Sequence, residues 1–236
     1  GYSDQILERL KVRYKQYYDS RKRTADGMMM HRGFRFLASG DIRFGLPLPQ
    51  KIDTITAEAV KSWLTPYFLT APLEISVVGD FDRDTIINEA AVYIGSLAER
   101  APFPLKSPAQ DKIAFPKGEQ LQLQVETDIE TAMVRVTFLT DDFYDIHQTR
   151  RLSLLSRIIS ERLRKVIREE LGESYSPYVY NHASTVYMGY GVFHVVVSIK
   201  PGNQELVLSK IQQIIEDVIQ NGITDQETVL ALNPVK

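Results

Sequence analysis

The sequence contains no cysteine, and this absence removes two kinds of site at once. Without thiols the chain forms neither disulfide bonds nor thiolate metal sites, although it would survive oxidising and reducing compartments alike. No apolar run approaches the roughly 20 residues that a membrane-spanning helix needs. The chain also lacks a large excess of charge of either sign. Its formal net charge is -2, which gives no general reason to expect nucleic acid or a membrane as a partner.

Signatures of common enzyme classes are missing as well. The chain has no HExxH or HxxEH zinc motif, no GxSxG nucleophile motif and no GxGxxG phosphate loop. Its four histidines are scattered, and His194 alternates with Val192 and Val196 in an expected strand, which favours a structural histidine over a metal ligand. The acidic stretch at 141–145 could hold a hard cation, but it lacks the pattern of a calcium loop, and a solvated helix N-terminus is the better interpretation.

What is present is enough for one large domain or two small ones. The chain has 236 residues, of which 44% are hydrophobic and 25% charged, as is ordinary for a globular protein. It opens with GYSDQILERL, in the middle of a helical pattern and without an initiator methionine, so we expect an excised fragment or a processed chain.

In the first hundred residues, apolar spacing and capping residues predict three helices and a buried strand. Thr56 and Asp82 are the expected N-caps of the second and third helices. The stretch 26–41 is rich in turn residues and receives no assignment. The strand is expected at 73–80 and the helices at 4–23, 55–68 and 81–100.

Prolines crowd residues 101–118, where large apolar side chains are few, which predicts an extended linker. We therefore expect the end portion of one domain at 1–100 and most of a second at 119–236. The pattern of the second part predicts a hairpin of strands at 119–127 and 131–140, followed by a long helix at 145–171. Two further strands are expected at 174–183 and 191–200, and a last helix at 203–222.

The fold class expected from this order is α+β, with ferredoxin-like-related layers of helices on a mainly antiparallel sheet. The long helix carries an apolar stripe that should face the sheet, because its members recur every three and four residues. The stripe comprises Leu155, Ile158, Ile159, Leu163, Val166, Ile167 and Leu171.

The junction between the long helix and the next strand holds the candidate site. Arg168 lies one turn from the end of the helix, and Tyr175 follows seven residues later at the head of the strand. One interpretation is structural: a cation near a helix C-terminus and a tyrosine of high strand propensity. The other is that guanidinium and phenol converge beyond the sheet edge, where they would bind a carbonyl or carboxylate of a peptide.

Two stretches of the chain resemble a known family. ERLRKVIREELGESYSPYV is similar to the part of M16-type zinc peptidases (the insulinase, pitrilysin and processing-peptidase group) where a helix ending in charged residues leads to Gly and Tyr-Ser. ITAEAVKSWLTPYF followed by LEISVVGDFD resembles that family's helix, strand and Val-Gly-Asp turn. Order and spacing also match, so the resemblance extends from about residue 50 to 223.

The resemblance implies a clamshell enzyme built from repeated α+β lobes. One half carries HxxEH and a distal Glu that hold zinc and supply the base, whereas the opposing half carries an Arg and a Tyr that bind substrate. By position these two are Arg168 and Tyr175, as substrate-binding residues. This chain departs from the family pattern by having no HxxEH, so it resembles the non-catalytic part, with no catalytic residue, no metal ligand and no cofactor of its own.

The expected partners follow from that resemblance. They are a peptide substrate and an HxxEH-bearing catalytic domain of the same or another chain, which would hold the zinc; a homo-oligomer is a further option. The chain is not expected to be active alone. Exported bacterial relatives suggest a periplasmic location.

Two other functions compete with this one. A proteolytically inactive relative could act as a scaffold or docking subunit, and the presence or absence of HxxEH in the parent sequence would separate the two. A ferredoxin-like nucleic-acid binder would expose Tyr178, Tyr180 and Tyr187 on its sheet, but the balanced charge argues against it.

Overall fold

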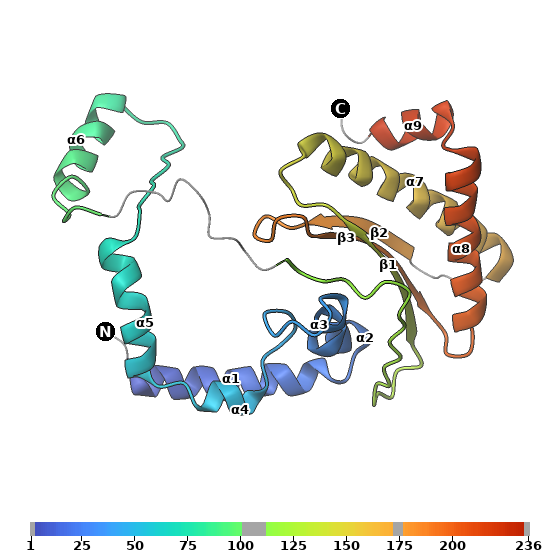
Figure 1. Cartoon of the computed structure of the whole chain (residues 1–236), viewed down its shortest axis with the longest axis horizontal. Coiled ribbons are helices and arrows are strands. Elements are labelled where there is room, and N and C mark those ends of the chain that lie inside the picture. Colours follow the sequence, from blue (N-terminus) through green and yellow to red (C-terminus); the bar gives the residue numbers. More distant parts are fainter. Residues whose placement is uncertain (1–2, 101–111, 172–176, 234–236) are drawn as a thin grey trace. The chain divides into compact units, whose positions relative to one another are not determined.

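The computed structural model describes residues 3–100, 112–171 and 177–233 (Figure 1). These residues divide into two compact units, one over 1–17 and 48–109 and the other over 18–47 and 110–236. The division of the chain into two related domains joined at 101–118 stays a prediction. The structure adds that the segment 18–47 packs with the second unit.

An antiparallel sheet of three strands forms the centre of the second unit. Its strands are β1 (Ala132–Thr140), β2 (Pro177–Ala183) and β3 (Gly191–Ile199), in the spatial order β1-β3-β2. The mixed helical and antiparallel architecture confirms the α+β class. The expected hairpin is wrong, however, because 119–127 forms no strand and β1 pairs with β3 alone among the described residues.

Two long helices cover one face of this sheet. They are α7 (Ile146–Leu171) and α8 (Gln204–Asn221), close to the ranges that the apolar periodicity predicts. The predicted packing of α7 is confirmed. Their shared core with the sheet contains the buried Ile159, Leu163 and Ile167 of α7, with Leu155 and Val166 partly buried beside them.

A short helix that the sequence analysis missed, α9 (Asp225–Leu232), follows α8. Gly222 ends α8 with a φ of 76° and a ψ of -158°, a conformation that is essentially restricted to glycine. Thr224 and Glu227 then form a capping box at the start of α9. Arg162 of α7 donates to both carboxylate oxygens of Glu227 and to Asp217 of α8, so one guanidinium joins three helices.

Within the second unit, the segment 18–47 lies on the sheet face opposite α7 and α8. It contains α2 (Ala25–Met28), the π-helical turn η1 (Met29–Gly33) and α3 (Phe34–Leu37), which fill the stretch that the sequence left unassigned. Ala38 is buried in one apolar cluster with Tyr190 and Val192, and the Tyr190 hydroxyl donates to the Leu37 carbonyl. Residues 18–47 therefore help to cover the sheet face that α7 and α8 leave open.

Helices are the regular secondary structure of the first unit's described part. It contains most of α1 (Asp4–Arg21), α4 (Pro49–Asp53), α5 (Ala57–Thr70) and α6 (Arg83–Tyr93). Both predicted caps are confirmed: the Thr56 side chain accepts from Ala59 N, and Asp82 accepts from Thr85 N. None of the described helices is both long and apolar enough to cross a membrane.

The strand predicted at 73–80 is wrong. This segment is largely exposed and extended, and Val78 reaches 96% exposure. Its alternating apolar residues suit a strand, but a strand needs a neighbour for its backbone hydrogen bonds. The first unit offers none within its described residues, which explains why the pattern does not become a sheet.

Candidate functional site

The structure places only part of the predicted pair. Arg168 lies in the last turn of α7, as expected from the sequence, but its side chain is outside the described part of the chain. Tyr175 falls in 172–176, also outside the described residues. Whether the two side chains converge therefore stays a prediction.

The strand β2 begins at Pro177 and carries two tyrosines on one face. Tyr178 and Tyr180 alternate with the buried Val179, so they point away from α7 and α8. Their rings stack with centroids 5.9 Å apart and an interplanar angle of 8°. Tyr178 is 40% exposed, so solvent reaches its side chain. The two tyrosines belong to a polar cluster that also contains Arg135, Asp26 and His194.

The centre of this polar cluster is Arg135 of β1, which sequence reasoning missed. Its side chain is only 11% exposed, and Nη1 donates to the Tyr180 hydroxyl at 2.9 Å. The other two nitrogens of the guanidinium, Nη2 and Nε, form no short hydrogen bond with the described residues. Nη2 lies 4.0 Å from Met133 Sδ and 3.7 Å from an Asp26 carboxylate oxygen, and Nε has no hydrogen-bond partner among the described residues.

Among the described residues, Asp26 of α2 is the carboxylate that lies within 4 Å of this guanidinium. It also accepts from the Tyr178 hydroxyl, at a long 3.5 Å, while 63% of its own side chain is exposed. Charge-assisted hydrogen bonds are normally about 2.7–2.9 Å long. Asp26 therefore faces Arg135 and Tyr178 without forming a close contact with either.

His194 of β3 lies under the tyrosines and is almost fully buried. Its Nδ1 is 2.9 Å from Thr137 Oγ1, and its ring centroid is 4.8 Å from that of Tyr180. Burial, with Arg135 and then His182 adding to it, lowers the pKa of His194 to about 3. The imidazole is thus neutral near pH 7, and Arg135 is the fixed positive charge beneath Tyr178 and Tyr180.

The tyrosine hydroxyl at the edge of the cluster is held in its protonated form. Burial and the Asp26 carboxylate raise the pKa of Tyr178, with Arg135 acting in the opposite direction. The cluster therefore presents a guanidinium and a phenolic O–H to any oxygen that approaches. Such a pair binds carboxylates and carbonyls, and it supplies neither a nucleophile nor a base.

The acidic stretch 141–145 serves local structure. Asp142 accepts from the backbone N–H groups of Tyr144 and Gly189, and Asp145 accepts from those of His147 and Gln148 at the start of α7. Within the described part of the chain, no group of three or more His, Cys, Asp or Glu side chains could hold a metal ion. The zinc that the family resemblance implies thus has no fitting set of ligands there.

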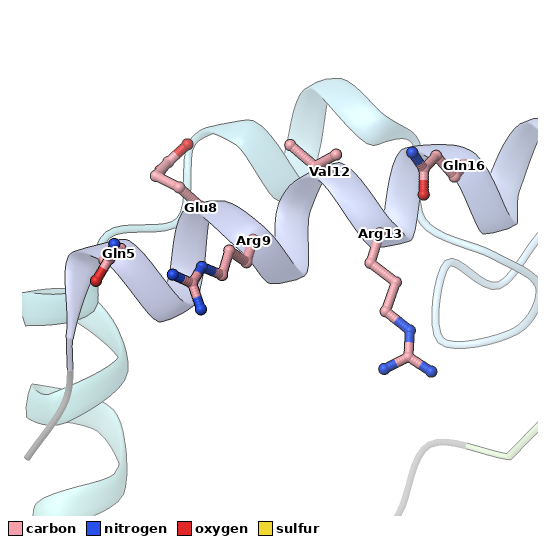
Figure 2. A pocket seen from close by; sticks show the side chains of 6 residues that line it. All are labelled: Gln5, Glu8, Arg9, Val12, Arg13 and Gln16. Carbon is pink, nitrogen blue, oxygen red and sulfur yellow. The ribbon is translucent and has the colours of Figure 1, made fainter.

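An open hollow of about 750 Å³ lies along α1 in the first unit. Figure 2 shows that the side chains around it all belong to this one helix. A hollow with a single helical wall cannot surround a ligand, so it is not a candidate site. Its lining residues are Gln5, Glu8, Arg9, Val12, Arg13 and Gln16.

Comparison with known families gives a match over most of the chain. The profile described as "Peptidase M16 inactive domain" matches residues 54–234. A relative, the chloroplastic stromal processing peptidase of Pisum sativum, is 30% identical over 95 residues, which are 40% of this chain and 8% of the relative. The chain thus spans a small part of that protein.

Two solved bacterial structures have a similar fold. The periplasmic protease PqqL from Escherichia coli has a TM-score of 0.67 at 16% identity, over 99% of this chain and 26% of that protein. A peptidase M16 inactive domain from Pseudomonas fluorescens also has a TM-score of 0.67, at 18% identity, over 99% of this chain and 56% of that one. Because the sequence identity is low, these similarities show the fold alone.

Proposed function

Because this chain belongs to the family of M16 peptidase inactive domains, we propose that it is the substrate-binding, catalytically incomplete part of a zinc-dependent peptidase that hydrolyses peptides. The observation that carries this proposal is the family match over residues 54–234 in a sequence without HxxEH. A zinc site and a general base would be supplied by a catalytic domain of the same or another chain.

The division of labour follows from the chemistry of amide hydrolysis. The reaction needs an activated water and stabilisation of the charge that develops on the carbonyl oxygen. This chain would contribute only to the second requirement and to holding the peptide. We assign that role to Arg168 and Tyr175, because the helix-end arginine and strand-head tyrosine match the family pattern and can donate to a carbonyl oxygen.

A double-mutant cycle in the parent protein tests this assignment. Losing one preorganised donor should lower turnover by about a hundred- to a thousandfold. Since Arg168→Ala and Tyr175→Phe would remove donors to one reacting carbonyl, the double variant should lose less than the product of the single losses. Both kcat and KM should be measured, with thermal melting of each variant as a folding check.

A matched control lies one turn earlier on the same helix. Arg164 is exposed and pairs with Glu161, so Arg164→Ala removes the same charge without touching the proposed site. Wild-type turnover in both single variants would reject the assignment. A large loss of stability in either variant would instead support the structural interpretation of that residue.

The absence of HxxEH also suits a scaffold or docking subunit, which is the second candidate function. The parent sequence discriminates between them: an HxxEH motif in the same chain favours the peptidase, whereas none in the parent or in a co-purifying subunit favours the scaffold. Residence in the periplasm, by analogy with the periplasmic PqqL, is part of the proposal and is tested by cell fractionation.

A further inference from the structure

The guanidinium of Arg135 has more donor capacity than the protein around it uses. A guanidinium carries five N–H donors, and within the described part of the chain only the bond to Tyr180 is short and well formed. The thioether of Met133 is a weak acceptor, and Nε has no partner among the described residues. A largely buried cation in this state is costly unless an anion completes its hydrogen bonds.

Asp26 is placed as a loosely held carboxylate at this cation. It approaches Arg135 Nη2 at 3.7 Å and the Tyr178 hydroxyl at 3.5 Å, both longer than a close charge-assisted bond. More than half of its side chain remains in solvent, and Tyr178 beside it is also exposed. A second carboxylate can therefore reach Arg135 and Tyr178 from solvent by displacing one side chain.

We propose that Arg135, Tyr178 and Tyr180 form a subsite for an acidic side chain of a bound polypeptide, and that Asp26 occupies this subsite in the absence of the ligand. The subsite rests on the proposed function for the peptide nature of its ligand. A Glu or Asp carboxylate would accept from Arg135 and from the Tyr178 hydroxyl, while Tyr180 holds the guanidinium in place.

The geometry favours a carboxylate over other groups. Arg135 is positive, Tyr178 is a protonated donor and His194 behind them is neutral, so the subsite offers donors and one full positive charge. A peptide carbonyl would leave that charge uncompensated. A bulky anion such as a nucleic-acid phosphate would find one buried cation here, whereas backbone phosphates are held by several exposed lysines and arginines.

Binding by the whole chain, residues 1–236, tests the subsite directly. The probes are three short peptides with blocked N-termini, measured by isothermal titration calorimetry. One has a central Glu and an amidated C-terminus; the second has Gln in its place. The third has Gln and a free C-terminal carboxylate. Loss of a hydrogen-bonded charge should weaken binding about tenfold or more, so the Glu peptide should bind best.

Variants separate a subsite from a structural ion pair. Removing the internal carboxylate with Asp26→Asn should raise affinity for the Glu peptide about two- to fivefold, because an ion pair this long and exposed is weak. The Gln peptide should not gain. Asp19→Asn is the matched control, since Asp19 is an exposed partner of Lys22 and the net charge changes equally.

Loss-of-binding variants complete the test. Tyr178→Phe removes only a hydroxyl at an exposed position, and Arg135→Lys keeps the charge but loses the planar fork. Both should weaken the Glu peptide and bring it towards the Gln peptide, with unchanged circular dichroism. Should Arg135→Lys fail to fold, Tyr178→Phe and Asp26→Asn still decide the matter.

Three results would overturn the proposal. They are equal affinity for the Glu and Gln peptides, preference for the free C-terminal carboxylate, and an Asp26→Asn variant that loses stability without gaining affinity. The assay needs no catalytic domain, so its failure is distinct from failure of the hydrolytic test with Arg168 and Tyr175.

Discussion

Replacing Glu227 by glutamine should destabilise the second unit in a pH-dependent way. Arg162 donates to this carboxylate through Nε at 2.6 Å and Nη2 at 2.9 Å, and Thr224 donates through its backbone N–H and hydroxyl. These hydrogen bonds, that of Arg162 first, lower the pKa of Glu227 from 4.5 to about 2. The ionised form is therefore favoured in the folded chain.

The size of the effect follows from that pKa. A fall from 4.5 to about 2 sets an upper bound of about 3.4 kcal/mol at 1.36 kcal/mol per pH unit. Glu227 keeps 27% of its side chain exposed and Arg162 18%, so solvent weakens the interaction. We expect Glu227→Gln to reduce the free energy of unfolding by about 1–2 kcal/mol at pH 7.

The sign of the pH dependence is fixed by the direction of the shift. Because the folded-state pKa lies below the unfolded value, the stabilisation is complete well above 4.5 and is lost as pH falls towards 2. With these two values, less than half of the pH 7 contribution remains at about pH 3. The difference between wild type and variant should narrow accordingly.

Urea denaturation followed by circular dichroism, at several pH values between 3 and 7, measures this difference. Glu205→Gln is the control, since Glu205 is an exposed glutamate in the first turn of α8 and lacks an arginine partner among the described residues. Like Glu227→Gln, this variant removes a negative charge from the first turn of a helix, so it controls for the general effect of that charge. An equal loss in both variants, or a loss that does not change with pH, would refute the reasoning.

Three further outcomes are expected. Leu163→Ala, at a fully buried position, should cost about 2–5 kcal/mol in urea denaturation, whereas Leu230→Ala on the exposed side of α9 should cost little. Gly222→Ala should cost about 1–3 kcal/mol, because φ 76° with ψ -158° is a region that glycine alone adopts readily, while no atom within 4 Å would clash with the added Cβ; an unchanged denaturation midpoint would contradict this. After dialysis, elemental analysis of the isolated chain should find no stoichiometric zinc, and retained zinc with chelator-sensitive peptide cleavage would contradict the expected absence of a ligand set.

The sequence predicts the second unit's helices well because their apolar stripes are long and regular. Ile159, Leu163 and Ile167 are spaced at four residues, and all three are buried where α7 meets the sheet. The helix α9 was missed because it has only eight residues, although Thr224 and Glu227 carry the S/T-x-x-E pattern of a capping box. A search for caps in addition to apolar periodicity would have found it.

Strands were harder to predict, since alternation describes a strand's faces and not its neighbours. Segments 73–80 and 119–127 alternate well enough, yet neither forms a strand in the described structure. The polar cluster shows the same limit. Arg135 was visible as a lone charge in a strand and Asp26 as a turn residue, but only the fold brings β1 and α2 together.

The packing of residues 18–47 on the sheet has a consequence for the order in which the second unit folds. Tyr190 contacts Leu37 across 153 positions, and Tyr178 contacts Asp26 across 152. On a ribosome, residues 18–47 emerge long before the strands that they cover, so they cannot form these contacts until the strands have been synthesised. Contacts of such long sequence separation also form slowly in refolding. The earlier of the two contacting segments is therefore among the last to reach its final place.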